Sequence, residues 1–296
     1  MIHNFGADIT SVITYTLSFL ALFIGTITDL KTREVPDWLN YGLVISGIGL
    51  NLLFSVIYLN SYFIINSIVG LAIFFGIAYI MFYAGQWGGG DSKMIMGLGA
   101  IIGIDVSLIK SQFLFGFFIN ALLIGAIYGL LWSIFLVFKN KQRFLKEFRE
   151  ILLEKNIVKT KKFMLLILVL LLILFFLIQV YYIKILILSI AFLILTSFYL
   201  WIFVKAIEKS AMHKLVEPTK LTEGDWIAKD VVVDGKYITG PKDLGISKNQ
   251  IKKLIQLHKQ KKVKKILIKE GIPFVPSFFI AFVVTLVFGN PLVLLL

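Results

Sequence analysis

The chain has no cysteine among its 296 residues, and its 17 acidic side chains are far outnumbered by 30 lysines and arginines. The absence of cysteine excludes disulfides, thiolate metal sites and cysteine nucleophiles. The three histidines, His3, His213 and His258, are widely separated in the sequence. We therefore expect no metal site and no bound cofactor.

Apolar residues make up 58% of the chain and gather in runs that suit a bilayer core, which takes about 20 helical residues to cross. The first run lacks the basic region and cleavage site of a signal peptide, so it is interpreted as a retained span. A nearly unbroken apolar stretch at 163–204 is too long for one crossing, and we expect a hairpin at Tyr181–Lys184. The expected spans are residues 9–28, 38–59, 62–84, 92–104, 112–138, 163–181, 184–204 and 274–296.

The distribution of basic residues predicts the orientation. With eight spans and both termini outside, 28 of the 30 lysines and arginines fall in the four segments assigned to the cytoplasm. Basic residues accumulate in cytoplasmic loops, which supports this assignment. It also accounts for the net charge of +13 without a nucleic-acid partner, and it makes anionic lipid head groups the expected partner of the basic loop 139–162.

The segment 205–273 has a different composition from the spans around it. Alternating polar and β-branched residues flank Asp234-Gly235, which predicts a strand hairpin. A helix is expected from Ser247 to about His258, followed by a closing strand in VKKILIKEG. The predicted fold class is thus an all-α polytopic membrane protein with a small cytoplasmic α+β module. Its parts are a membrane helical domain (1–204), the module (205–273) and a final transmembrane helix (274–296).

Two aspartates, Asp29 and Asp91, fall at the inner edges of the first and fourth spans. Paired carboxylates at one depth suit an aspartic hydrolase, in which one ionised carboxylate activates water while its protonated partner polarises the scissile carbonyl. Two structural interpretations remain open from spacing alone. Asp91 could be a helix N-cap, and Asp29 could pair with Lys31 or Arg33.

The local motifs favour the catalytic interpretation. Gly88-Gly89-Gly90-Asp91 gives G-x-G-D and continues as D-x-K to Lys93, while DLKTREVPDWLN follows from Asp29. This pair of motifs resembles the type IV prepilin peptidase family of intramembrane aspartic proteases, in particular its archaeal preflagellin peptidase branch. The resemblance covers roughly residues 15–130 well and the remainder more loosely.

The resemblance implies a catalytic pair of Asp29 and Asp91 and an active-site turn formed by Gly88, Gly89 and Gly90. Lys31, Arg33 and Lys93 match basic positions of the motifs, and we expect them to contact head groups or balance charge.

The implied activity is an aspartic endopeptidase that removes the short basic leader of type IV pilin-like or archaellin precursors. It would act in the cell membrane, with its active site and module on the cytoplasmic side. The alternatives are an ion- or proton-coupled transporter that uses the paired aspartates, and a membrane anchor that displays the 210–272 module. The sequence leaves open which precursor is processed.

Overall fold

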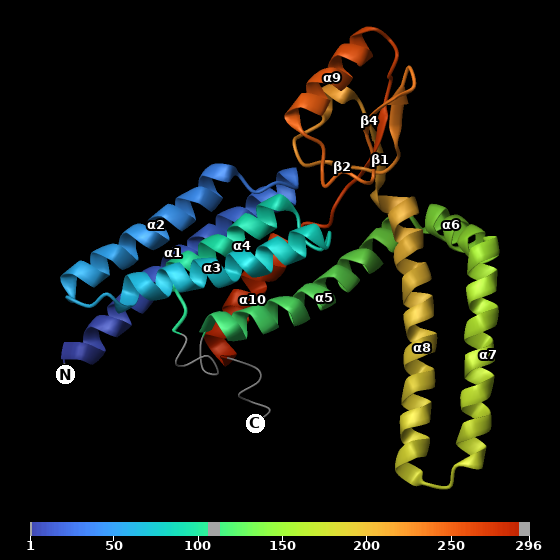
Figure 1. Ribbon diagram of the computed structural model, residues 1–296, viewed down its shortest axis with the longest axis horizontal. Coiled ribbons are helices and arrows are strands. Elements are labelled where there is room, and N and C mark those ends of the chain that lie inside the picture. The colour runs from blue at the N-terminus through green and yellow to red at the C-terminus, as the bar shows by residue number, and fades with distance from the viewer. Residues whose placement is uncertain (1, 106–112, 290–296) are drawn as a thin grey trace. The chain divides into compact units, whose positions relative to one another are not determined.

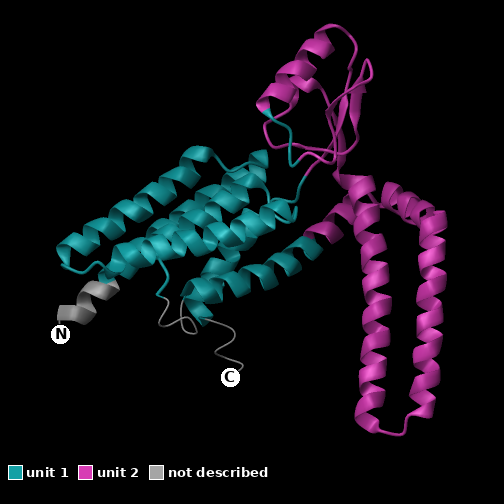
Figure 2. Cartoon of the chain, viewed as in Figure 1, with its two compact units in different colours: residues 1–131, 244–247, 271–296 teal, residues 132–243, 248–270 magenta. Residues whose placement is uncertain are grey.

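The computed structural model (Figure 1) describes residues 2–105 and 113–289, with side chains from residue 9 onward. It divides into two compact units, shown in Figure 2. Unit 1 comprises residues 1–131, 244–247 and 271–296, and unit 2 comprises residues 132–243 and 248–270.

Helices form at all eight predicted apolar segments, and six helices in the described part are long and apolar enough to cross a membrane. This confirms the predicted polytopic membrane class. The helices are α1 (Ile2–Thr32), α2 (Asp37–Ile57), α3 (Tyr62–Tyr83), α4 (Gly89–Ile102), α5 (Phe113–Lys139), α6 (Lys141–Leu153), α7 (Lys155–Leu177), α8 (Tyr181–Ile207), α9 (Lys248–Lys259) and α10 (Val275–Phe288).

Helix α4 is the centre of unit 1, although it has only 14 residues and is shorter than a bilayer core. Met94, Ile95 and Leu98 are completely buried within it. Its glycines allow the neighbouring helices to approach closely: a Cβ on Gly99 would lie 2.5 Å from the Gly70 carbonyl oxygen of α3. Close packing of small residues is a common way to hold helices together in lipid, and here it fixes the helix that carries Asp91.

Helix α10 packs on α1 and completes the core of unit 1. Phe278 and Phe282 are fully buried in this core, and Phe278 meets the Trp87 ring edge-on at a centroid distance of 5.2 Å. Trp87 is only 3% exposed, so its ring lies in the core of unit 1 and not on the lipid-facing surface. The Trp87 ring belongs to the core cluster and directly precedes the glycine turn at residues 88–90.

Two boundaries in the second half of the chain differ from the sequence prediction. The apolar stretch 163–204 forms two helices, which confirms the predicted hairpin, but its position is wrong. The break lies at residues 178–180, and α8 begins at Tyr181, the residue at which the sequence predicts the turn to start. The segment 139–162, expected as a loop, is mostly helical. Phe144 and Ile151 lie on one face of α6 and are buried against Phe203 and Ile202 of α8, which explains the helix.

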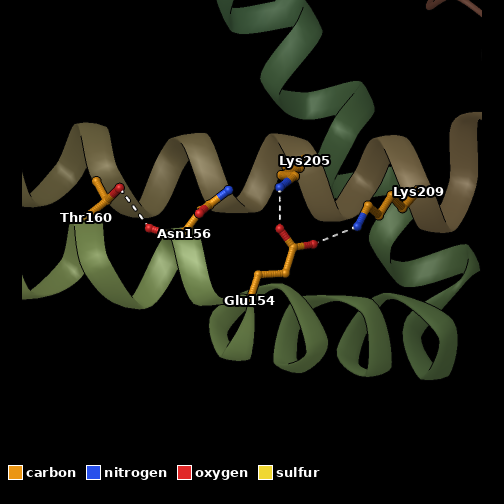
Figure 3. A network of polar contacts seen from close by, with 5 residues as sticks. All are labelled: Glu154, Asn156, Thr160, Lys205 and Lys209. Carbon is orange, nitrogen blue, oxygen red and sulfur yellow. Dashed lines mark hydrogen bonds and ion pairs between the residues drawn. The ribbon is translucent and has the colours of Figure 1, made fainter.

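A carboxylate joins α8 to the break between α6 and α7 (Figure 3). Glu154 accepts hydrogen bonds from the Lys205 ammonium at 2.7 Å and the Lys209 ammonium at 2.9 Å. These two hydrogen bonds hold the pKa of Glu154 below its ordinary value. The network fixes the base of the α7–α8 hairpin.

The predicted α+β module is present within unit 2. Strand β5 (Ile266–Lys269) lies between β1 (His213–Val216) and β2 (Trp226–Ile227), with both pairings antiparallel. The predicted hairpin is confirmed as β3 (Val231–Val233) and β4 (Lys236–Thr239). Its two turn residues, Asp234 and Gly235, have φ of 51° and 72°, as a type I′ turn requires.

Strand β1 and the short helices around it were not predicted. The π-helix η2 (Glu208–Met212) follows α8 directly and leads into β1. The 3-10 helix η3 (Pro218–Lys220) comes after β1. The division of the chain at residues 204 and 273 stays a prediction.

Candidate active site

Asp29 lies in the last turn of α1, and Asp91 is the third residue of α4. The carboxyl groups are close enough for the charge of Asp29 to act on Asp91. Asp29 is 5% exposed, whereas Asp91 is partly exposed. The structure thus brings the two predicted aspartates together within unit 1, at the point where α4 packs against α1.

The carboxyl of Asp29 is held by the beginning of α10. The backbone N–H of Val275, the first residue of that helix, donates to Asp29 Oδ2 at 3.0 Å. A helix N-terminus carries unpaired N–H groups and partial positive charge, so it stabilises a carboxylate. Pro276 in the first turn of α10 signals a helix start in the sequence, but nothing in the sequence indicates that this start meets Asp29.

The carboxyl of Asp91 is held by its own turn. The N–H of Gly88 donates to Asp91 Oδ2 at 2.9 Å, and Gly88 is the N-cap residue of α4. Asp91 is therefore not the N-cap. It occupies the third helical position, and its carboxyl accepts the hydrogen bond of the N-cap N–H, as the acidic member of a capping box does. A capping contact and a role in the carboxyl pair are compatible in this geometry.

Among the three glycines of the turn, Gly90 lies closest to residues that are not part of the turn. A Cβ on Gly90 would lie 3.1 Å from the Val35 Cβ and 3.4 Å from the Val35 backbone nitrogen. On Gly88 the nearest atom would be Asp91 Oδ2 at 3.2 Å, and on Gly89 a ring carbon of Phe82 at 3.9 Å. Close approach of the segment before α2 thus explains the glycine at position 90.

Contacts from the beginning of α2 hold the first turn of α4 in place. Lys93 forms an ion pair with Asp37 at 2.6 Å, and its ammonium lies 5.2 Å from the centre of the Tyr41 ring. The Asn40 side-chain amide, which is fully buried, donates to the Gly90 carbonyl at 3.4 Å. We call Asp37, Asn40, Tyr41 and Lys93 the α2–α4 clamp. The sequence indicated Lys93 but neither of its partners.

The other predicted supporting residues are placed differently. Arg33 follows α1 with a left-handed φ of 62°, and its charge acts on Asp29. Lys31 is exposed at the end of α1. Tyr128 of α5, which sequence reasoning missed, interacts electrostatically with both Asp29 and Arg33. It had no signal in the sequence because tyrosine is common in apolar helices.

A groove of about 360 Å³ opens between α2, α3 and α4. Its lining is almost wholly apolar apart from the clamp residues Asn40, Tyr41 and Lys93, and neither aspartate belongs to it. The described residues contain no group of three histidine, aspartate or glutamate side chains placed to hold a metal ion.

Residues 16–130 match the model of the type IV leader peptidase family. Over 90 residues the chain is 41% identical to a preflagellin peptidase of Methanocaldococcus jannaschii and 38% identical to one of Methanococcus maripaludis. A third, from Methanococcus voltae, is 40% identical over the same length. Each match covers 30% of this chain and 38 to 39% of the relative.

The chain therefore spans about two fifths of the length of the curated relatives it matches. The matched region of the family contains both aspartates and the α2–α4 clamp. These similarities confirm the resemblance that the G-x-G-D motif and the segment after Asp29 indicated.

Proposed function

We propose, on the basis of the type IV leader peptidase match over residues 16–130, that this chain is a membrane aspartic endopeptidase with Asp29 and Asp91 as its catalytic pair. The observation that carries the proposal is the electrostatic interaction of Asp29, at the end of α1, with Asp91, at the start of α4. Both lie in the matched region, and each is held by a backbone N–H.

The chemistry follows from two carboxyl groups that share a site. Two like charges a few Å apart are unfavourable, so one proton is retained between them. The ionised member takes a proton from water, and the hydroxide attacks the peptide carbonyl while the protonated member donates to the carbonyl oxygen. The first carboxyl then gives its newly gained proton to the leaving nitrogen, while the second takes back a proton from a hydroxyl of the tetrahedral intermediate. The C–N bond breaks, and the pair returns to its first state with one shared proton.

The fixed carboxyls contribute orientation to this reaction. Rotation of Asp29 is limited by the Val275 N–H, and rotation of Asp91 is limited by the Gly88 N–H. A general acid and base that are already oriented avoid the entropic cost of bringing them into position at each turnover. In the proposed roles, Arg33 balances the charge of the pair, Lys93 positions α4, and Lys31 contacts lipid head groups.

The proposed substrate is a pilin-like or archaellin precursor whose short basic leader precedes an apolar helix. The three relatives are named preflagellin peptidases, which supports this substrate class. The two aspartates lie at helix ends, which supports cleavage at the membrane edge. The bias of basic residues supports the cytoplasmic edge as the location of this site and anionic lipid as the partner of residues 139–162.

Coexpression with candidate pilin and archaellin precursors tests the proposal. The expected result is a mobility shift of leader size in at least one precursor, and no shift when both aspartates are replaced by asparagine. Full processing by the double variant would contradict the assignment of this catalytic pair, and no processing of any precursor by the wild type would favour the transporter or membrane-anchor alternatives. The matched relatives are peptidases by name and give the transporter no support.

A further inference from the structure

One segment of the α+β module carries positive charge without any acidic residue. Residues 247–269 contain nine lysines and no aspartate or glutamate. The segment runs through α9 and then into β5. Elsewhere in the module acidic and basic residues are mixed, so this separation of charge is local.

Most of these lysines are exposed and lie outside ion pairs. Lys248 pairs with Glu223, Lys262 with Asp234 and Lys269 with Glu208. In the described part of the chain, the remaining six have no carboxylate within ion-pair distance, and all six are exposed. We call them the lysine face: Lys252, Lys253, Lys259, Lys261, Lys264 and Lys265.

The opposite side of α9 is occupied by the module itself. Leu254 is completely buried, and α9 packs against η3 and β4. The His258 ring is tied to the Val263 carbonyl at 2.8 Å, which fixes the end of the helix relative to the segment that follows. The lysine face is therefore presented by a folded surface and not by a loose tail.

The chain itself keeps this surface near the membrane. Strand β1 follows α8 after only the five residues of η2, and β5 is separated from α10 by residues 270–274. Five residues span at most about 18 Å when fully extended. The sheet is thus tied at two points to helices that are apolar enough for the bilayer, one of them long enough to cross it. A surface held this close meets lipid head groups at high effective concentration.

We propose that the lysine face docks on anionic lipid head groups of the membrane in which the chain is embedded. Clusters of lysine beside a transmembrane helix bind anionic lipid surfaces through summed electrostatic attraction. Lysine suits this task because its ammonium is a compact charge on a flexible stem, which can follow a disordered layer of head groups. The proposal is independent of the peptidase activity, since it concerns a different part of the chain.

The test uses the full chain, which is naturally free of cysteine. A single fluorophore is attached at Gln260→Cys, an exposed position between lysines of the face. The protein is placed in nanodiscs that contain a head-group quencher, with either zwitterionic lipid alone or 30% phosphatidylglycerol. Docking predicts at least twofold stronger quenching with the anionic lipid, and loss of the difference at about 1 M salt, where the Debye length falls to about 3 Å.

A matched pair of variants locates the effect. The test variant changes Lys252, Lys259, Lys261 and Lys264 to glutamine. The control changes four exposed lysines elsewhere in the module, Lys220, Lys229, Lys236 and Lys242, and so removes the same charge. The test variant should lose the lipid-dependent quenching and the control should keep it.

Equal quenching in both lipids, or equal loss in both variants, would overturn the proposal. Soluble polyglutamate or RNA that relieves the quenching at micromolar concentration in anionic nanodiscs would assign the lysine face to a polyanionic macromolecule instead.

Discussion

At the scale of single residues, a substitution in the α2–α4 clamp should displace Asp91 while the aspartate itself stays unchanged. Lys93→Met breaks the ion pair with Asp37 and removes the cation above Tyr41. Both charges are partly exposed, so stability should fall by only about 1 kcal/mol or less. Cleavage should fall by about tenfold or more, because small displacements of a catalytic group are costly to rate. Initial rates of leader removal and thermal unfolding in detergent measure the two effects.

A second ion pair on an exposed helix surface provides the control. Lys146→Met breaks the pair of Lys146 with Glu150 in α6, which lies in the other unit of the chain. It should leave both rate and stability nearly unchanged. Equal rates for Lys93→Met and the wild type would show that the clamp does not position Asp91.

The residues of the site differ in how far the sequence indicated them. Asp29 and Asp91 stand in recognisable motifs, so their proximity could be expected from short stretches of chain. The Val275 N–H that donates to Asp29 comes from a residue far away in the sequence. The Asn40 amide donates to the Gly90 carbonyl only because α2 packs against α4. Contacts of this kind depend on tertiary structure, and neither a backbone N–H nor a lone asparagine leaves a pattern that reveals its partner.

At the scale of elements, the packing of α3 on α4 predicts opposite effects for two glycines of the same helix. A Cβ on Gly70 would lie 2.2 Å from the Gly99 carbonyl oxygen, so Gly70→Ala must separate the helices. We expect a loss of stability of about 2 kcal/mol or more. A Cβ on Gly76 meets nothing within 4 Å, so Gly76→Ala should be neutral or slightly stabilising through helix propensity. Thermal unfolding of the two variants in detergent distinguishes them, and similar stabilities would contradict the packing.

The contact of Glu154 with α8 predicts a dependence of stability on pH. Because the folded state holds the pKa of Glu154 below the ordinary value of 4.5, its contribution to stability is complete above that pH and disappears as pH falls through the lowered value. Glu154→Gln should therefore be less stable than wild type at pH 7, by about 1 kcal/mol or less. The difference should shrink below pH 4.5. Melting temperatures of both proteins across this range provide the measurement, and a difference that grows on acidification would contradict the assignment.

The elements themselves were mostly predictable, and their ends were not. Apolar runs located all eight hydrophobic helices, since length and hydropathy determine whether a segment can enter a bilayer. Helix α6 was missed because its buried residues, Phe144 and Ile151, are sparse among charges in a basic segment. The sequence prediction places the turn at Tyr181 and Tyr182, but these residues begin α8, and the break lies at 178–180.

At the scale of the whole molecule, the orientation of the chain can be tested by cysteine labelling. Single cysteines introduced at positions 150 and 242 would lie on exposed parts of α6 and of the α+β module. With both segments in the cytoplasm, a membrane-impermeant thiol reagent should label them only after the cells are opened. The absence of native cysteine removes background. Labelling in intact cells would reverse the proposed location of the module and of the active site.

The peptidase proposal also predicts how the two carboxyls behave as a unit. Asn retains the size and the accepting oxygen of Asp but cannot take a proton from water. Each single change, Asp29→Asn or Asp91→Asn, should therefore lower cleavage by at least about a thousandfold, and the double change should add little. A neutral amide avoids the cost of a carboxylate charge held beside the buried Asp29 position, so the variants should be no less stable than the wild type.

The most direct test is leader removal from a precursor in membranes by the wild type, the two single variants and the double variant, with thermal stability of each in detergent. A shared pair predicts near-complete loss of cleavage in all three variants at unchanged or higher stability. Cleavage retained by either single variant would contradict the mechanism, and a large loss of stability would instead give that aspartate a structural role.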